Sequence, residues 1–153
     1  MIVVSDTSPL SALLAIEQAD LLPKLFKRVL IPPTVRGELL RHHDELPVFL
    51  EVIPAQNQQA LNELRLEIAA GEAEAIVLAG EQNADYLLID ERLGTSVALR
   101  RGQQTMGMVG VLIRAKDCGH ITSLREQLDL LEKKTSFYLS SAFRKMVLEK
   151  VDE

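Results

Sequence analysis

Short apolar runs alternate along this chain with longer segments of helical periodicity, and this alternation constrains the fold more than any other feature. Residues 2–4, 29–31 and 86–89 are continuous apolar runs, too short for helices, so each predicts a buried strand. Residues 104–106 predict a further short strand. Strands that alternate with helices form parallel sheets covered on both faces. The sequence therefore predicts an α/β fold with three layers, α/β/α.

Helical periodicity and helix-boundary residues predict the remaining elements. Ser8 followed by Pro9 is typical of an N-cap with proline at the first helical position, and Gly71 is expected to end a helix. The predicted helices cover residues 10–19, 35–42, 57–69, 72–81, 91–101, 109–116, 124–133 and 139–150. The last of these either closes over the core or presents aromatic side chains to a partner.

Length, charge and cysteine content limit the class of protein. The 153 residues suffice for one domain with a substantial core, and the net charge of −5 argues against binding nucleic acid through bulk positive charge. Cys118 is the single cysteine, which excludes an intrachain disulfide and a cysteine-based metal site. The apolar start at residues 1–4 is too short for a secretion signal, and no run approaches the ~18 apolar residues of a membrane span. We expect a cytoplasmic protein with no membrane segment.

Acidic side chains follow two of the predicted strands. Asp6 comes just after the first strand and Asp90 directly after the run at 86–89, while Glu38 and Glu74 lie on neighbouring predicted helices. The carboxyl ends of parallel strands meet at one sheet edge, where ligands bind in such folds. Clustered carboxylates repel one another and need a compensating charge, for which Mg²⁺ or Mn²⁺ is suited.

A zinc site is disfavoured by the histidines. His42 and His43 are adjacent, so their rings are expected to point to different sides of a helix instead of sharing one face. With no cysteine pair available, the sequence favours a hard cation bound by oxygen.

Each acid also has an ordinary structural interpretation. Asp6 and Asp90 could cap the helices that follow them, and Glu38 could be a solvated helix residue. Glu72 and Glu74 lie in a first helical turn, where acids gain from the helix dipole. We retain that interpretation for Glu72. The joint arrangement of the others favours a functional site.

Five segments, read in order, carry a family resemblance. They are VSDTSPL at 4–10, the helix with Glu38, GEAEAI at 71–76, LIDE at 88–91 and GMVGVL at 107–112. Together these segments resemble the PIN-domain family, in particular its small prokaryotic subgroup related to VapC-like toxin ribonucleases. The resemblance spans about residues 1–120.

The resemblance implies a fold, a site and an activity. The fold is a Rossmann-like parallel sheet of four to five strands, in which acids bind Mg²⁺ or Mn²⁺ for cleavage of RNA. Matched motif to motif, the four family acids fall on Asp6, Glu38, Glu74 and Asp90. All four are expected to be catalytic and to bind the metal.

The same resemblance implies a domain organisation and partners. Residues 1–120 are expected to form the PIN-like nuclease domain, and residues 121–153 a helical extension packed on it. VapC-like proteins commonly form homodimers and are inhibited by an antitoxin, so both partners are expected beside the RNA substrate.

Charge is distributed unevenly near the predicted site. Residues 51–90 carry a net charge of −7 and residues 92–116 a net charge of +5. The basic block predicts either a tract for RNA phosphates or an ordinary solvated helix face.

Phosphodiester hydrolysis fits the predicted acids independently of the resemblance. Metal ions held by carboxylates lower the pKa of a bound water and stabilise the charged transition state. The leading prediction is a metal-dependent endoribonuclease with a toxin role. The alternative is a catalytically silent PIN-like module that binds RNA or protein. A receiver-like phosphoacceptor or a dehalogenase-type phosphatase would need a different acidic pair after the first strand.

Overall fold

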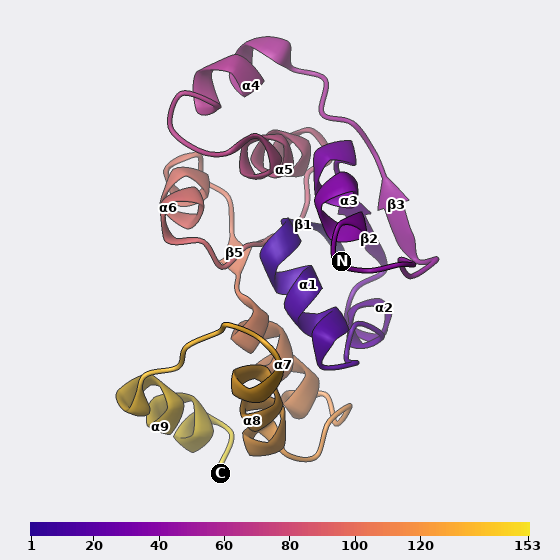
Figure 1. The fold of residues 1–153 in the computed structure, drawn as a ribbon. Coiled ribbons are helices and arrows are strands. Elements are labelled where there is room, and N and C mark those ends of the chain that lie inside the picture. The colour runs from indigo at the N-terminus through magenta and orange to yellow at the C-terminus, as the bar shows by residue number, and fades with distance from the viewer.

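A computed structural model describes residues 1–153, which form a five-stranded sheet and nine helices (Figure 1). The strands are β1 (Ile2–Ser5), β2 (Arg28–Ile31), β3 (Leu50–Val52), β4 (Tyr86–Leu88) and β5 (Thr105–Met106). The helices are α1 (Thr7–Ala15), α2 (Leu21–Leu25), α3 (Pro33–Leu40), α4 (Gln58–Leu64), α5 (Ala70–Glu81), α6 (Arg92–Arg100), α7 (Met108–Asp117), α8 (Leu124–Lys134) and α9 (Ser141–Lys150). None of these helices has the length and apolar character needed to cross a membrane.

The sheet is entirely parallel, as predicted, and its strand order is β3-β2-β1-β4-β5. The chain therefore builds outward from β1 in one direction and then returns to add β4 and β5 on the other side. Ser5 pairs with Leu88 at the end of the central pair, and the Asp6 amide donates to the Leu88 carbonyl at 2.9 Å. This reversal point is where open α/β sheets bind ligands.

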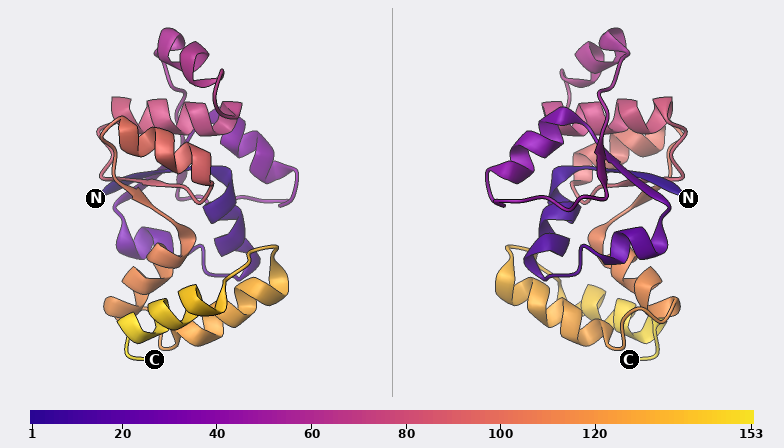
Figure 2. Two further views of the ribbon diagram at one scale, coloured as in Figure 1. Left: turned by 90° about the vertical axis from the view of Figure 1, so that its left-hand side faces the viewer. Right: turned by 90° about the vertical axis from the view of Figure 1, so that its right-hand side faces the viewer.

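Side chains alternate across the sheet and fill two separate cores, which confirms the three-layer arrangement. Val3 and Leu88 pack in the core formed with α1, α2 and α7, whereas Val4 and Leu87 pack in the core formed with α4, α5 and α6. Figure 2 shows these two groups of helices on opposite sides of the sheet. Both faces of β1 and β4 are thus buried, which explains why their sequences are continuously apolar.

The first helix begins earlier than its proline suggested. α1 starts at Thr7 with Asp6 as its N-cap residue, so Ser8 is not the cap that we expected. It ends at Ala15, and Glu17 has a positive φ of 59° that prevents the helix from continuing to residue 19. The short helix α2 follows and has no counterpart among the predicted elements.

Further differences lie between β2 and β4, where α4 ends at Leu64 and not at residue 69 as predicted. The edge strand β3 was not predicted, because its three residues are partly exposed and include Glu51, which pairs with Arg28. Gly71 does not end a helix but lies inside α5, where it is buried. A Cβ atom on Gly71 would lie 2.7 Å from Glu38 Oε1, so the glycine allows α3 and α5 to approach closely.

The last two helices extend one of the two cores. Leu128 and Leu131 of α8 and Val147 of α9 are buried beside α7. The Glu153 carboxylate accepts a hydrogen bond from the Leu124 amide at 2.6 Å and ties the chain end to α8. One face of α9 therefore joins the core while Phe143 and Met146 stay exposed on the other.

Candidate functional site

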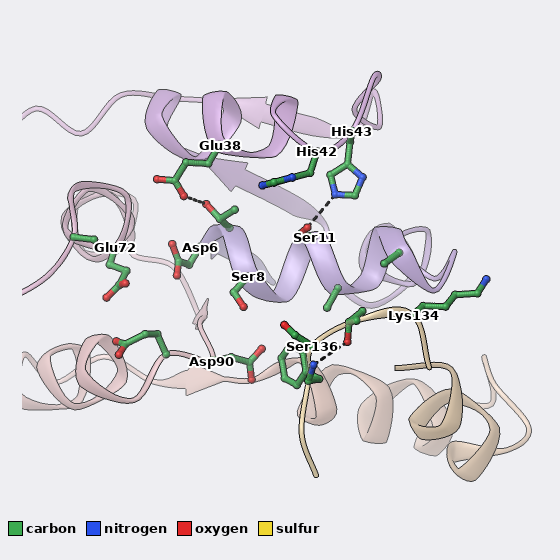
Figure 3. A pocket seen from close by; sticks show the side chains of 17 residues that line it. Asp6, Ser8, Ser11, Glu38, His42, His43, Glu72, Asp90, Lys134 and Ser136 are labelled. Carbon is green, nitrogen blue, oxygen red and sulfur yellow. Dashed lines mark hydrogen bonds between the residues drawn. The ribbon is translucent and has the colours of Figure 1, made fainter. Parts of the chain in front are cut away.

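A cavity of 810 Å³ lies beyond the carboxyl ends of β1 and β4, and five of its 17 lining residues are acidic (Figure 3). Its five acidic residues are Asp6, Glu38, Glu72, Asp90 and Glu91. None of them forms an ion pair with a lysine, an arginine or a histidine. The cavity is therefore rich in negative charge that the protein itself does not neutralise.

Asp6 is held at this edge by the sheet, and a hydrogen bond from the Thr7 backbone favours its charged form. It is the N-cap residue of α1, yet its side chain makes no capping hydrogen bond, and only 5% of the residue is exposed. Burial raises the pKa of Asp6 to about 6, and the neighbouring carboxylates, Glu38 first among them, add to the rise. Helix capping does not account for this residue.

Asp90 binds a different helix from the one that it precedes. Glu91 caps α6, because its Oε2 accepts from the Gly94 amide at 2.6 Å. The Asp90 carboxylate instead accepts from the Met108 amide at the start of α7, at 3.0 and 3.2 Å. Burial raises the pKa of Asp90 to about 6 although this hydrogen bond opposes the rise. Asp90 therefore does not cap α6, the helix that follows it, but binds the first amide of α7.

Glu38 and Glu72 approach the cavity from two helices. Glu38 accepts a hydrogen bond of 2.6 Å from the hydroxyl of Thr7, the residue after Asp6, so it is not a freely solvated side chain. Glu72 lies in the first turn of α5 and points into the cavity. Burial, followed by the charges of Asp6 and Glu91, raises the pKa of Glu72 to about 7. We expected Glu72 only to interact with the helix dipole, whereas the structure places it in the cavity.

Glu74 is not among the residues that line the cavity. It follows Glu72 by two positions, which is a rotation of about 200° around a helix, so the two side chains leave α5 in different directions. Glu74 is partly buried, and its Oε2 atom is buried without a hydrogen-bond partner. The structure thus brings Asp6, Glu38 and Asp90 together and adds Glu72 and Glu91, but places Glu74 apart.

Three glycines make room for the acids. A Cβ atom would lie 2.7 Å from Glu38 Oε1 at Gly71, 2.7 Å from Glu72 Oε2 at Gly94, and 2.5 Å from Asp90 Oδ1 at Gly107. Each glycine therefore lies where a larger residue would displace a carboxylate of the site. Such glycines are a signal that the sequence contains but that strand and helix patterns do not reveal.

The donor set fits a hard divalent cation in its chemistry. Every acid is a carboxylate oxygen donor, as Mg²⁺ and Mn²⁺ prefer, and a cation would offset the charge that burial leaves uncompensated. No three acidic, histidine or cysteine side chains lie close enough together to hold an ion as they stand. Such an ion would be bound through water or after small side-chain rotations, as is common for Mg²⁺, which retains several waters.

The basic block at residues 92–116 does not form one tract beside the acids. Arg100 pairs with Glu67 at 3.0 Å, and Arg114 stacks over Phe26 and Tyr86. The Lys116 ammonium donates to the Thr122 carbonyl at 2.6 Å. None of the five basic residues of the block lines the cavity.

Other polar residues of the cavity were not predicted. Both His42 and His43 line it, although we expected the two rings to point to different sides of a helix. Helix α3 ends at Leu40, so both histidines follow the helix instead of lying on it. Lys134 lines it from the end of α8, far away in the sequence. No local pattern connects these residues to the acids, so only the tertiary fold reveals them.

The raised pKa values predict that the metal-free protein loses stability as the pH rises. The folded chain holds more protons than the unfolded chain between the ordinary pKa of 3.8 and the folded values of about 6 at Asp6 and Asp90. We expect the free energy of unfolding in EDTA to be lower at pH 8 than at pH 5, by about 1.4 kcal/mol for each buried carboxyl.

Thermal unfolding at the two pH values measures this effect. Asp6→Asn removes one of the titrating groups and should reduce the pH dependence. Glu153 does not interfere, because burial is outweighed by hydrogen bonds that lower its pKa from 4.5 to about 2, and its contribution is lost only at lower pH. A midpoint that rises steadily from pH 5 to pH 8 would contradict the prediction.

Comparison with known proteins identifies a family. A family model described as a PIN domain matches residues 2–153. The match contains every residue of the acidic cavity. No curated protein and no solved structure matches the chain.

Proposed function

The chain belongs to the PIN-domain family, whose members are generally nucleases, and from this premise we propose that it is a metal-dependent endoribonuclease. The observation that carries the proposal is the cavity at the sheet edge, where five carboxylates gather without a basic partner. A site of this composition repels the phosphates of RNA unless a cation is bound. Its chemistry therefore supports hydrolysis of phosphodiester bonds with a divalent metal ion.

Asp6 and Asp90 are the proposed principal metal ligands, with Glu38 and Glu72 beside them. PIN nucleases typically use divalent metals, and Mg²⁺ or Mn²⁺ suits these carboxylates. When bound, such an ion lowers the pKa of a coordinated water and neutralises charge on the phosphate.

Neighbouring groups orient the proposed ligands. The Thr7 hydroxyl holds Glu38, and the Met108 amide holds Asp90. Hydrogen bonds to ligating carboxylates fix their direction, and their loss typically costs about 10- to 100-fold in metal affinity or activity. We assign Thr7 and Met108 positioning roles only.

The direct test uses purified protein and single-stranded RNA. We expect internal cleavage with Mg²⁺ or Mn²⁺, none in EDTA, and recovery when the metal is restored. RNA binding with no metal-dependent cleavage would instead support the silent binding module. Activity that persists in EDTA would point to a contaminating ribonuclease.

A matched pair of variants distinguishes the two glutamates of α5. Because Glu72 lines the cavity and Glu74 does not, we expect Glu72→Gln to lower cleavage at limiting Mg²⁺ by about tenfold. Glu74→Gln is expected to stay within about threefold of the unaltered protein. The measurement is the cleavage rate as a function of Mg²⁺ concentration.

If Glu74→Gln lowered cleavage more than Glu72→Gln, the third acid of the family would be Glu74. In that case Glu74 would hold a second ion or a water of the first, as the resemblance implies, and its unpartnered Oε2 is a free acceptor for this purpose. Equal losses in both variants would place both glutamates in the site.

The toxin role, the homodimer and the antitoxin partner are the finer predictions of the resemblance. Light scattering of the purified chain tests the dimer. Growth arrest on expression, relieved by the product of a small neighbouring gene, tests the toxin and its partner.

A further inference from the structure

The acidic cavity has a second end of different chemistry. Figure 3 shows Asp6, Glu72 and Asp90 on one side of the cavity, and Ser11, His43 and Lys134 on the other. At that second end the Ser11 hydroxyl and His43 Nε2 lie 2.9 Å apart. The lining thus changes from carboxylates to hydroxyl and imidazole groups, with Lys134 at the far edge.

Lys134 is the only lysine or arginine that lines the cavity, and its ammonium group has no ion-pair partner. Its side chain makes no ion pair and no hydrogen bond. Arg28, Arg100 and Arg144, in contrast, are each paired with a glutamate. The Lys134 ammonium is therefore free to bind an anion.

The size of the cavity exceeds what a metal site alone requires. Six water molecules, the usual shell of a hydrated Mg²⁺, take up roughly 200 Å³ at about 30 Å³ each. The cavity measures 810 Å³. Several times that volume remains for a substrate that extends from the acids toward Lys134.

We propose that the Lys134 end of the cavity is a subsite for an RNA phosphate farther along the strand than the cleaved one. This inference rests on the proposed function, because it takes the cleaved phosphodiester to lie at the carboxylates. RNA carries one negative charge per nucleotide, so a chain that crosses the acidic end must meet compensating positive charge nearby. Lys134 provides that charge, and Ser11 provides a hydroxyl that can donate to a phosphate oxygen.

The subsite also gives the proposed C-terminal extension a role in the reaction. Lys134 and the following Thr135 and Ser136 belong to residues 121–153, outside the proposed nuclease domain at 1–120, yet all three line the cavity. The extension would thus set how the RNA strand is held.

Binding to RNA tests the charge of the subsite. Lys133 is the matched control, because it lies on the same turn of α8, is exposed and does not line the cavity. In an Asp6→Asn background that prevents cleavage, we expect Lys134→Ala to weaken binding of a labelled single-stranded RNA by about three- to tenfold at low salt. The slope of log affinity against log salt should fall by about 0.7, the value for one phosphate contact. Lys133→Ala should leave the RNA affinity and the salt slope nearly unchanged. Lys134→Arg should keep both close to the values measured with Lys134.

Substrate length separates a phosphate contact from a structural effect. With cleavage-competent protein, Lys134→Ala should slow the cleavage of RNAs that extend beyond the cleaved bond on one side. It should have no effect on the shortest substrate that has only the cleaved phosphate. A variant that merely disturbed α8 would slow all substrates alike and lower the thermal midpoint.

The two proposals can fail separately. If the unaltered protein cleaves RNA but Lys134→Ala and Lys133→Ala behave alike at every length and salt concentration, the subsite is wrong and the nuclease stands. If no RNA is cleaved with any metal, the proposed function is wrong. A loss that is equal for all substrate lengths overturns the subsite.

Discussion

RNA cleavage by the Asp6→Asn and Asp90→Asn variants is expected to fall by at least about 100-fold, because each variant loses a carboxylate ligand at the sheet edge. A bound metal stabilises transition-state charge by several kcal/mol, and each 1.4 kcal/mol corresponds to about tenfold in rate. Asn has nearly the shape of Asp but no charge, so it binds Mg²⁺ poorly. The measurement is the cleavage rate of single-stranded RNA at saturating Mg²⁺.

Both variants should fold at least as well as the unaltered chain. The raised pKa of Asp6 and of Asp90, about 6 in each case, means that ionisation of these buried carboxyls opposes folding at pH 8. Asn removes that cost, so the thermal midpoint in EDTA at pH 8 should be unchanged or higher. Full cleavage by either variant, with EDTA still inhibiting it, would exclude that residue as a ligand.

Cleavage by the Gly107→Ala variant is expected to fall by about 10- to 100-fold through displacement of Asp90. The new Cβ would lie 2.5 Å from Asp90 Oδ1, so the carboxylate must leave its position at the Met108 amide. A misplacement of about 1 Å at a reacting centre can cost about 100-fold. The Gly107 backbone, with φ −84° and ψ 175°, is open to any residue, so backbone strain does not contribute.

Gly37→Ala is the control for this prediction. Gly37 lies exposed in α3 and has no atom within 4 Å of its Cβ position, so alanine should stabilise the helix slightly, by about 0.4–1 kcal/mol. Cleavage by Gly37→Ala should match the unaltered protein. If Gly107→Ala cleaves equally well, the position of Asp90 in the structure is not the one used in catalysis.

The pattern of apolar runs predicted much of the architecture because it reflects burial directly. β1 and β4 are covered on both faces, so their sequences are continuously apolar and recognisable. β3 was missed because an edge strand of three partly exposed residues leaves no such pattern. β4 is as short as β3, so the burial of β4, and not its length, made that strand predictable.

The candidate site was predictable in part for a topological reason. Asp6 and Asp90 follow strands that are neighbours at the reversal of the strand order, so position relative to a strand end was enough to pair them. Glu72 and Glu74 differ by two positions on one helix, and the direction of each depends on how α5 packs against the sheet. Sequence periodicity alone does not fix that direction. We expected Glu74 in the site and a helix-dipole role for Glu72, whereas the structure places Glu72 in the cavity.

The sequence by itself determined the parallel α/β fold, the family resemblance and the acids at two strand ends, because all of these follow from local pattern and chain order. Only the tertiary structure decided that Glu72, His43 and Lys134 share a cavity with those acids. It also showed that Gly107 leaves space for Asp90. These contacts join segments far apart in the chain, and packing of whole helices brings them together without a local signal at either partner.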